Sequence, residues 1–331
     1  MNLPSIDAPA HLAVHAQLLL GKHGEELLTV VKATYLLPRD EDELVIADQG
    51  RPVRFIDEHW DDPATSAPKY PGDICGVKPS TDVVFVAKGY APEGRSVKSF
   101  DVLVRVGTLS RMLRIHGLRV WTEGGSGLSA PRPLSEQEIR YDLAWGGLDV
   151  SDPAEPVGEL RNPVGRGVVR DKRTLTHEQA PCIEDPKEPI MSASARLTPV
   201  GIGPIGPHWK PRRDRVGTYD DAWLREQAPL LPHDFDERAN QCASPGLIAS
   251  PPLRGNEMVE LAGLTPGGGA VRFALPSMSV SIDDSVPPLD TVIVDTLHVP
   301  DDCTAVVELV WRSLTPAALP LQQTTVVVRV N

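Results

Sequence analysis

Short runs of alternating apolar and polar residues, bounded by turn-forming residues, constrain the fold of this chain more than any other feature. The run 11–20 places its apolar side chains on one parity, and the run 100–106 does the same. Period-two alternation is typical of a strand with one buried face. The apolar residues of the first run are Leu12, Val14, Ala16, Leu18 and Leu20.

Turn signals separate these runs from several others that we expect to form strands. The turns 107–110 and 265–269 each indicate a hairpin. Long amphipathic helical segments between the runs are missing from the sequence, which argues against a parallel α/β fold. The sequence therefore predicts a mainly β protein with antiparallel, sandwich- or barrel-like sheets. The other expected strands are 27–36, 82–90, 111–121, 258–261, 270–275, 277–282, 291–299, 304–311 and 324–330.

The middle of the chain differs from both ends because it has little periodicity and many turn-forming residues. Proline accounts for 33 of the 331 residues, which is about twice its usual share. We therefore expect three regions. They are an N-terminal β region over 1–125, an irregular Pro/Gly-rich segment over 126–253, and a C-terminal β region over 254–331 that packs on the first.

Two short helices are expected within the middle segment. Ser135 and Glu138 fit a capping box, in which each side chain bonds a free backbone N–H group at a helix start. The second helix runs from Asp220 to about Ala228, because Asp220 is a good capping residue and Pro229 ends the helix.

The charge of the chain limits its partners. The formal net charge is −12, which disfavours nucleic acid and anionic membranes because both attract positive charge. The apolar patch 18–20 is short and Asp7 stands where a signal peptide carries positive charge. No stretch approaches the roughly 18 apolar residues that a membrane span needs. We expect a cytoplasmic protein.

Motifs for cofactors and nucleophiles are weak. The stretch 201–206 matches GxGxxG, but Pro204 removes a backbone N–H group and Pro207 blocks entry into a helix, so we interpret it as a surface turn. No GxSxG motif is present. The four cysteines show no CxxC spacing, and we expect free thiols. These observations favour a protein without a cofactor or catalytic residues.

One acidic cluster leaves two interpretations open. His233, Asp234 and Asp236 stand close together and suit a divalent cation. This supports an alternative function, a metal-dependent hydrolase. The simpler interpretation is that Asp234 or Asp236 caps a short helix starting near Glu237, with Arg238 paired to a carboxylate.

The same part of the chain, from Gly217 to Leu247, is unusually dense in aromatic and charged residues for a connector between prolines. Such side chains either hold a loop on the core or contact a partner, and the sequence does not choose between these. The residues that we expect to contact a protein partner are Trp209, Arg212, Arg213, Tyr219, Asp220, Trp223, Asp234, Phe235, Asp236 and Arg238.

Six local patterns, in this order along the chain, resemble one family. They are Lys78-Pro-x-Thr81-Asp82-Val83, His116-Gly-x-Arg119-Val-Trp121, Tyr141-x-x-Ala144-Trp145-Gly146-Gly147, Asn162-Pro-Val-Gly165-Arg166-Gly167, Gly217-Thr218-Tyr219-Asp220-x-x-Trp223 and Leu231-Pro232-x-Asp234-Phe235-Asp236-x-Arg238. Together they resemble the family known as domain of unknown function 2169, over nearly the whole chain.

The resemblance implies an adaptor or chaperone of bacterial type VI secretion. Members are typically encoded beside spike proteins, PAAR-type tip proteins and toxic effectors, so the implied partner is an effector or its tip protein, which the adaptor helps to load onto the spike. No catalytic residues are implied. One departure concerns Arg119, because an acidic residue more often precedes this arginine in the family, whereas Leu118 precedes it here. We therefore expect a non-enzymatic, protein-binding function.

Overall fold

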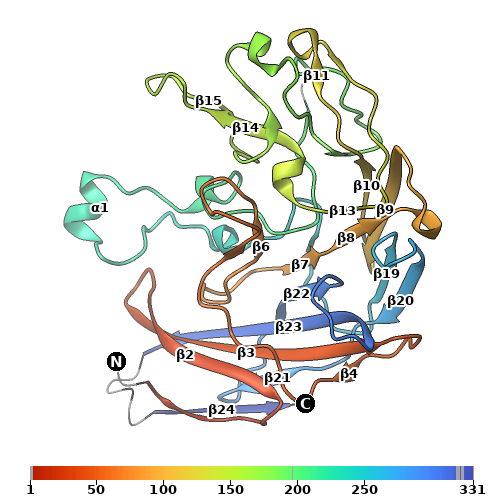
Figure 1. Cartoon of the computed structure of the whole chain (residues 1–331). Coiled ribbons are helices and arrows are strands. Elements are labelled where there is room, and N and C mark those ends of the chain that lie inside the picture. Colours follow the sequence, from red (N-terminus) through yellow and green to blue (C-terminus); the bar gives the residue numbers. More distant parts are fainter. Residues whose placement is uncertain (1–2, 196, 318–320, 322–323, 331) are drawn as a thin grey trace.

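The protein is described by a computed structural model that covers residues 3–195, 197–317, 321 and 324–330 (Figure 1). Strands dominate, and the one α-helix among these residues is α1 (Asp221–Glu226). The prediction of a mainly β protein with antiparallel sheets is confirmed, and the sheets in the described ranges are open. Short 3-10 turns are η1 (Pro92–Gly94), η2 (Glu123–Gly125), η3 (Tyr141–Leu143), η4 (Lys172–Leu175), η5 (Arg213–Arg215) and η6 (Glu237–Asn240).

A seven-stranded sheet forms the centre of the molecule. Its order is β18 (Ile248–Ala249), β7 (Thr81–Val86), β22 (Leu289–Asp295), β23 (Cys303–Pro316), β3 (Glu25–Pro38) and β2 (Leu12–Leu20), with β4 (Val45–Ile46) also on β3. β7 and β22 are parallel and the other neighbours are antiparallel. The N-terminal and C-terminal regions therefore share one sheet, a closer association than the packing of one region on the other that we expected.

Two further sheets complete the main core. A five-stranded sheet has the order β17 (Ile183–Glu184), β10 (Leu109–His116), β9 (Ser99–Val106), β19 (Met258–Ala262) and β20 (Ala270–Ala274), and a three-stranded sheet the order β1 (Ser5–Asp7), β24 (Thr325–Val330) and β21 (Val280–Ile282). Small pairs are β5 (Glu58–His59) with β6 (Pro68–Tyr70), β8 (Lys88–Tyr90) with β13 (Glu136–Glu138), and β11 (Trp121–Thr122) with β12 (Gly127–Leu128). β14 (Trp145–Asp149) pairs with β15 (Val157–Glu159) and β16 (Arg166–Gly167).

The two faces of the central sheet have opposite chemistry. On one face, alternate residues of β3 such as Val31, Ala33 and Leu37 join the main apolar core, to which β21 and β24 also contribute. The intervening residues point to the other face, where Lys32 and Thr34 are buried as well. Because both faces are covered, β3 has an almost continuously buried sequence instead of a simple alternation.

Two of our expectations for the middle segment are wrong. Ser135 does not start a helix, because residues 136–138 form β13 and pair with β8. Strand pairing satisfies the backbone groups that the capping box would have served. The GxGxxG-like stretch is not a surface turn either, since Ile202 and Ile205 lie in the core and Gly206 packs against Trp209. The helix expected from Asp220 is confirmed as α1, although it ends at Glu226, two residues before Ala228.

In the described part of the chain, no helix is long and apolar enough to cross a lipid bilayer.

Candidate functional site

A layer of buried ion pairs covers the polar face of the central sheet. The loop 51–78 lies over this face and contributes four of the ten charged side chains. Five basic and five acidic residues balance each other, and all are buried except Arg51 and Arg54, whose side chains are 22 % and 8 % exposed. We call this set the ion layer; it consists of Lys32, Arg51, Arg54, Asp73, Lys78, Asp82, Asp290, Asp295, Glu308 and Arg312.

Glu308 is the centre of one half of the ion layer. Its carboxylate accepts two bonds from Arg54, at 2.6 and 2.7 Å, and lies 3.0 Å from both the Lys32 and Arg51 nitrogen atoms. Burial alone would raise the pKa of Glu308, but Lys32 and Arg54 outweigh this effect and lower the pKa to about 2. Glu308 is therefore held as a carboxylate by three cations.

Lys78 and Asp82, both from the first family-like motif, form another ion pair of the layer. The Lys78 amine donates to Asp82 at 2.8 Å and to the Thr291 hydroxyl at 2.9 Å. Asp82 also accepts from the backbone N–H of Cys242 at 2.7 Å, which ties the middle segment to the sheet. The motif spacing i to i+4 therefore serves an ion pair between a loop residue and strand β7. The ion layer joins the loop 51–78, the sheet and residue 242.

A second buried acidic residue explains the His116/Arg119 motif. Glu184 accepts from His116 at 2.8 Å and from Arg119 at 2.7 Å. The partner of Arg119 is thus distant in sequence, and Leu118 before it makes no difference to the ion pair. Burial would raise the pKa of Glu184, but these two partners lower it to about 2.

Stability is therefore expected to fall in acid. Glu308 and Glu184 have folded-state pKa values of about 2, below the value of about 4.3 in an unfolded chain. Their stabilising contribution is complete above about pH 5 and is lost as the pH falls towards 2. We expect the urea midpoint to drop between pH 5 and pH 3. The Glu184→Gln variant should show a shallower drop, and an equal slope for both proteins would contradict the assignment.

Trp121 of the His116/Arg119 motif and the next two motifs build a smaller core around two tryptophans. Trp121 and Trp145 meet edge to face, with ring centroids 6.4 Å apart. Asn162 donates to the backbone carbonyls of Tyr141 and Trp145, at 2.8 and 2.9 Å. Gly146 lies so close to Asn162 that a Cβ atom would stand 2.2 Å from the Asn162 carbonyl oxygen. These motif residues hold the fold of the middle segment.

The last two motifs form an arm that projects from the body beside the β2–β3 hairpin (Figure 1). We define the arm as residues 216–235. Its two ends are joined at the neck, where Asp234 accepts from the N–H and the hydroxyl of Thr218, at 2.9 and 2.7 Å. Next to the neck, the N–H of Asp236 donates to the carbonyl of Arg215 at 2.9 Å. The arm is therefore a loop whose two ends are hydrogen-bonded to each other.

The arm is held by its own side chains and by the hairpin. Asp220 caps α1 by accepting from the N–H of Trp223 at 2.8 Å. The Trp223 indole donates to the Leu230 carbonyl at 2.9 Å and meets the Tyr219 ring edge to face. Gln227 donates to the carbonyl of Lys22 at 2.7 Å, which fastens the arm to the hairpin tip.

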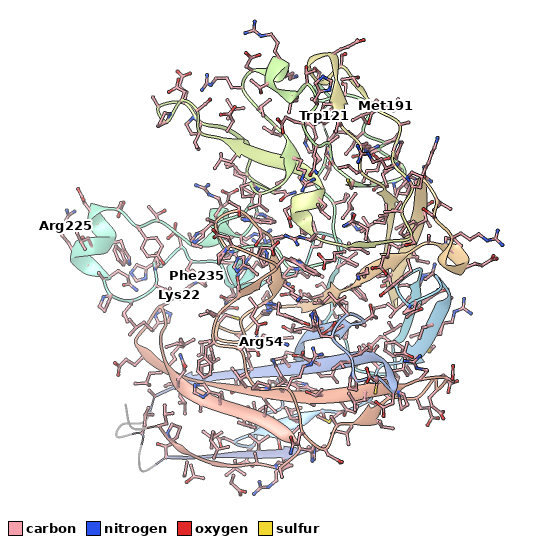
Figure 2. The ribbon with its side chains drawn as sticks, viewed as in Figure 1. Lys22, Arg54, Trp121, Met191, Arg225 and Phe235 are labelled. Atoms are coloured by element: carbon pink, nitrogen blue, oxygen red, sulfur yellow. The ribbon has the colours of Figure 1, made fainter. Side chains whose placement is uncertain are left out.

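Large apolar side chains nevertheless remain exposed on the arm. Tyr219 is 51 % exposed and Leu224 is 63 % exposed. At the base of the arm, a hollow of about 290 Å³ lies between the arm and the hairpin. Its apolar lining comes from Leu19, Leu20, Val77, Leu231, Phe235 and Leu314. Figure 2 shows Lys22 and Phe235 at this base and Arg225 at the outer end of the arm.

The β2–β3 hairpin is a part of the site that the sequence did not predict. Leu19, Leu20 and Lys22 resemble ordinary strand and turn residues, and they line the hollow together with Leu231, which is distant in the sequence. Lys22 lies 6.0 Å from the centre of the Phe235 ring. The only local signal was the apolar run 18–20, which leaves Leu20 43 % exposed at the end of β2.

The predicted partner-binding residues fall into two groups. Tyr219, Asp220, Trp223, Asp234 and Phe235 meet in the arm, as described above. Trp209 is corrected, because it is 6 % exposed and packs against Tyr141, which gives it a core role. Arg212 also serves the fold, since it donates to the carbonyls of Ala239 and Ile205. Arg213 is exposed in η5, outside the arm.

A family comparison adds to this geometry. A family model described as "Uncharacterized protein conserved in bacteria (DUF2169)" matches residues 22–312. The protein belongs to this family. No curated protein and no solved structure matches it. The DUF2169 match contains the ion layer, both tryptophans of the smaller core and the whole arm. It is shorter than the resemblance seen in the sequence, since all of β2 and all of β24 lie outside it.

Within this DUF2169 chain, the His233/Asp234/Asp236 cluster follows the capping interpretation. Asp236 caps η6 and pairs with Arg238, whose guanidinium lowers the pKa of the carboxyl to about 2. The carboxylate of Asp234 accepts hydrogen bonds from Thr218 at the neck. Among the described residues, no group of three His, Cys, Asp or Glu side chains is placed to hold a metal ion. Both carboxylates of this cluster are therefore used within the protein, one as a cap and one at the neck.

The neck predicts how the arm responds to mutation. Replacing Asp234 with alanine removes both bonds to Thr218, so the arm should open more often while the core keeps its contacts. We expect trypsin to cleave after the exposed Arg225 roughly tenfold faster than in the wild type, at an unchanged melting temperature. His233→Ala is the matched control, because this exposed neighbour has no bond to the neck. Equal cleavage rates in all three proteins would contradict the role of the neck.

Proposed function

We propose that this DUF2169 protein is a non-enzymatic adaptor that binds a protein partner through the arm. The observation that carries the proposal is the exposure of Tyr219 and Leu224 on a projection that is already ordered by its neck, cap and hairpin contacts. Aromatic side chains on a preorganised surface lose little entropy on binding and are enriched at binding hot spots.

The nature of the partner follows from the resemblance to proteins of type VI secretion loci. We propose that it is a secreted effector or its PAAR-type tip, which the adaptor loads onto the spike. The net charge of −12 favours a partner with a basic surface. The carboxylates of Glu308 and Glu184, whose pKa values are strongly lowered, are held in ion pairs inside the fold. This is what we expect of a rigid scaffold that binds a partner at its surface.

The arm should therefore be needed for partner capture. We expect the double variant Tyr219→Ser/Leu224→Ser to recover roughly tenfold less effector or tip protein in an affinity pull-down with mass spectrometry, from bacteria that express the secretion locus. Both side chains are more than half exposed, so the melting temperature should stay unchanged.

Met191→Ser is the matched control, because Met191 is 71 % exposed and lies far from the arm (Figure 2). It should recover the partner as the wild type does. Recovery of no secretion protein by the wild type would reject the adaptor function. Equal recovery by the double variant would reject the arm as the binding surface.

A further inference from the structure

A large hollow lies between the ends of the two large sheets, on the opposite side of the molecule from the arm (Figure 1). Its volume is about 820 Å³, almost three times that of the hollow at the base of the arm. The turn after β3, the hairpin β19–β20 and the loop between β22 and β23 contribute most of its walls. We call this hollow the basin; it is lined by residues from the segments 39–42, 265–272 and 296–304, together with Tyr90.

The wall that follows β3 makes the basin acidic. Four exposed carboxylates line it without an ion-pair partner in the described part of the chain, namely those of Asp40, Glu41, Asp42 and Asp301. Exposed carboxylates elsewhere on the surface, such as those of Asp101 and Asp171, pair with an arginine. The basin therefore gathers negative charge that the chain leaves largely unpaired.

The two arginines of the basin offset this charge only in part. Arg272 pairs with Glu260 at 2.7 Å, and Arg39 donates to the backbone carbonyl of Asp301 at 2.6 Å. One arginine without a carboxylate partner thus stands among four carboxylates. A hollow lined mainly by one sign of charge concentrates its field and attracts the opposite charge.

Two hydroxyl groups of the basin also lack a partner. Thr296 directly follows β22 and is 8 % exposed, yet its hydroxyl has no hydrogen-bond partner among the described residues. Buried polar groups are normally paired, so this hydroxyl indicates a place for a donor from outside the chain. The partly exposed Tyr90, from β8, makes no hydrogen bond through its hydroxyl in the described ranges, and a tyrosine ring can hold a cation over its face.

We propose that the basin binds a segment of the protein partner that carries lysine or arginine side chains. Ammonium and guanidinium groups have only donors, so they complement carboxylates and an unpaired hydroxyl. The inference rests on the proposed function for the nature of the partner. It adds a second contact, which recognises charge, to the apolar contact of the arm.

The size and the position of the basin favour an extended segment over a single small cation. Its volume of about 820 Å³ is at the upper end of the range of about 300–1,000 Å³ in which drug-sized molecules bind. The basin and the arm lie at opposite ends of β3, whose 14 residues span roughly 45 Å. A second copy of this chain fits the basin less well, because it would bring together two net charges of −12.

The test uses a fluorescently labelled synthetic peptide in which lysine alternates with serine, so it does not depend on identifying the cargo. Its anisotropy is titrated with the full chain at low and at high salt. The wild type should bind the peptide, and more weakly at high salt. Glu41→Gln/Asp42→Asn should weaken binding roughly tenfold, because two charge-assisted contacts are lost. Both side chains are exposed, so the melting temperature should stay unchanged.

A second double variant is the matched control for charge. Glu178→Gln/Glu188→Gln removes two negative charges from exposed side chains that lie outside the basin and form no ion pair among the described residues. It should weaken binding by less than about twofold, because salt screens distant charges.

Thr296→Val separates ligand binding from stability. The variant keeps the shape of the side chain and removes the unpaired hydroxyl. It should bind the peptide roughly threefold less tightly, while the melting temperature stays equal or rises, because an unsatisfied buried group is gone. A purely structural hydroxyl would leave peptide binding unchanged.

Absence of peptide binding by the wild type would overturn the proposal. Equal weakening in the two double variants would also overturn it, because it would show a diffuse attraction to the net charge. Spermine that binds as tightly as the peptide would assign the basin to a free polyamine instead. Peptide binding at the basin without capture of a secretion protein would reject the proposed function and leave the basin site standing.

Discussion

Replacing Glu308 with glutamine is expected to lower the free energy of unfolding by about 3–5 kcal/mol, the range seen when one partner of a buried ion pair is removed. Glu308 is fully buried among Lys32, Arg51 and Arg54. The amide of glutamine fills the same space, so the loss comes from leaving these cations without a counter-charge in a region of low dielectric constant. Urea denaturation followed by tryptophan fluorescence measures the change.

An exposed glutamate provides the matched control for this prediction. Glu136 pairs with Lys88 at 2.9 Å, but its side chain is 50 % exposed. Glu136→Gln should change the free energy of unfolding by about 0–1 kcal/mol, as is usual for a surface ion pair. Losses of equal size in the two variants would show that burial does not set the strength of the Glu308 contacts.

Replacing Gly146 with alanine is expected to destabilise the middle segment by about 3 kcal/mol or more, because a steric clash and backbone strain add together. The new Cβ atom would lie 2.2 Å from the backbone carbonyl oxygen of Asn162. Gly146 also has a φ of 154°, which side chains disfavour. Neither Asn162 nor Gly146 can move without disturbing the bonds that hold Tyr141 and Trp145.

Gly24 separates the two contributions. It has almost the same φ, 153°, but a Cβ atom there meets nothing within 4 Å. Gly24→Ala should therefore show only the strain, about 1–3 kcal/mol. The difference between the two variants, measured by urea denaturation, is the steric term. A difference near zero would mean that the packing around Asn162 yields easily.

Alternation alone was enough to predict most strands of the terminal regions. In β9, Phe100, Val102, Val104 and Val106 are buried while their neighbours face outward, as period two requires. The prediction failed where an isolated motif competed with long-range pairing. Ser135 and Glu138 satisfy the local rule for a helix start, but β8 offers backbone partners that no local pattern of this segment reveals.

The ion layer was missed because its members are scattered through strands and a loop. A signal was present in the sequence, since Lys32 and Glu308 each interrupt an apolar strand where a charge is costly. Such charges must find partners, but pairing them requires the register of β3 with β23 and the path of the loop 51–78. Sequence spacing supplied neither.

For aromatic residues too, the local sequence does not predict which side chains are buried and which are exposed. Trp209 and Tyr219 lie ten positions apart in one irregular, proline-rich stretch, and their local contexts differ little. Yet Trp209 packs against Tyr141 in the core, whereas Tyr219 is half exposed. Local sequence indicates that such side chains must be covered by something, and only the tertiary contacts distinguish the core from a surface.

The shared central sheet has a consequence for how the protein is made on the ribosome. β3 lies between β2 and β23, and Glu26 is paired with Pro316. The strand β3 therefore cannot pair with β23 until almost the whole chain has been synthesised. This takes roughly 15–60 s at bacterial elongation rates. During that interval, the nascent N-terminal hairpin exposes strand edges and needs protection from aggregation. We expect the expression yield of the whole protein to depend strongly on ribosome-associated chaperones.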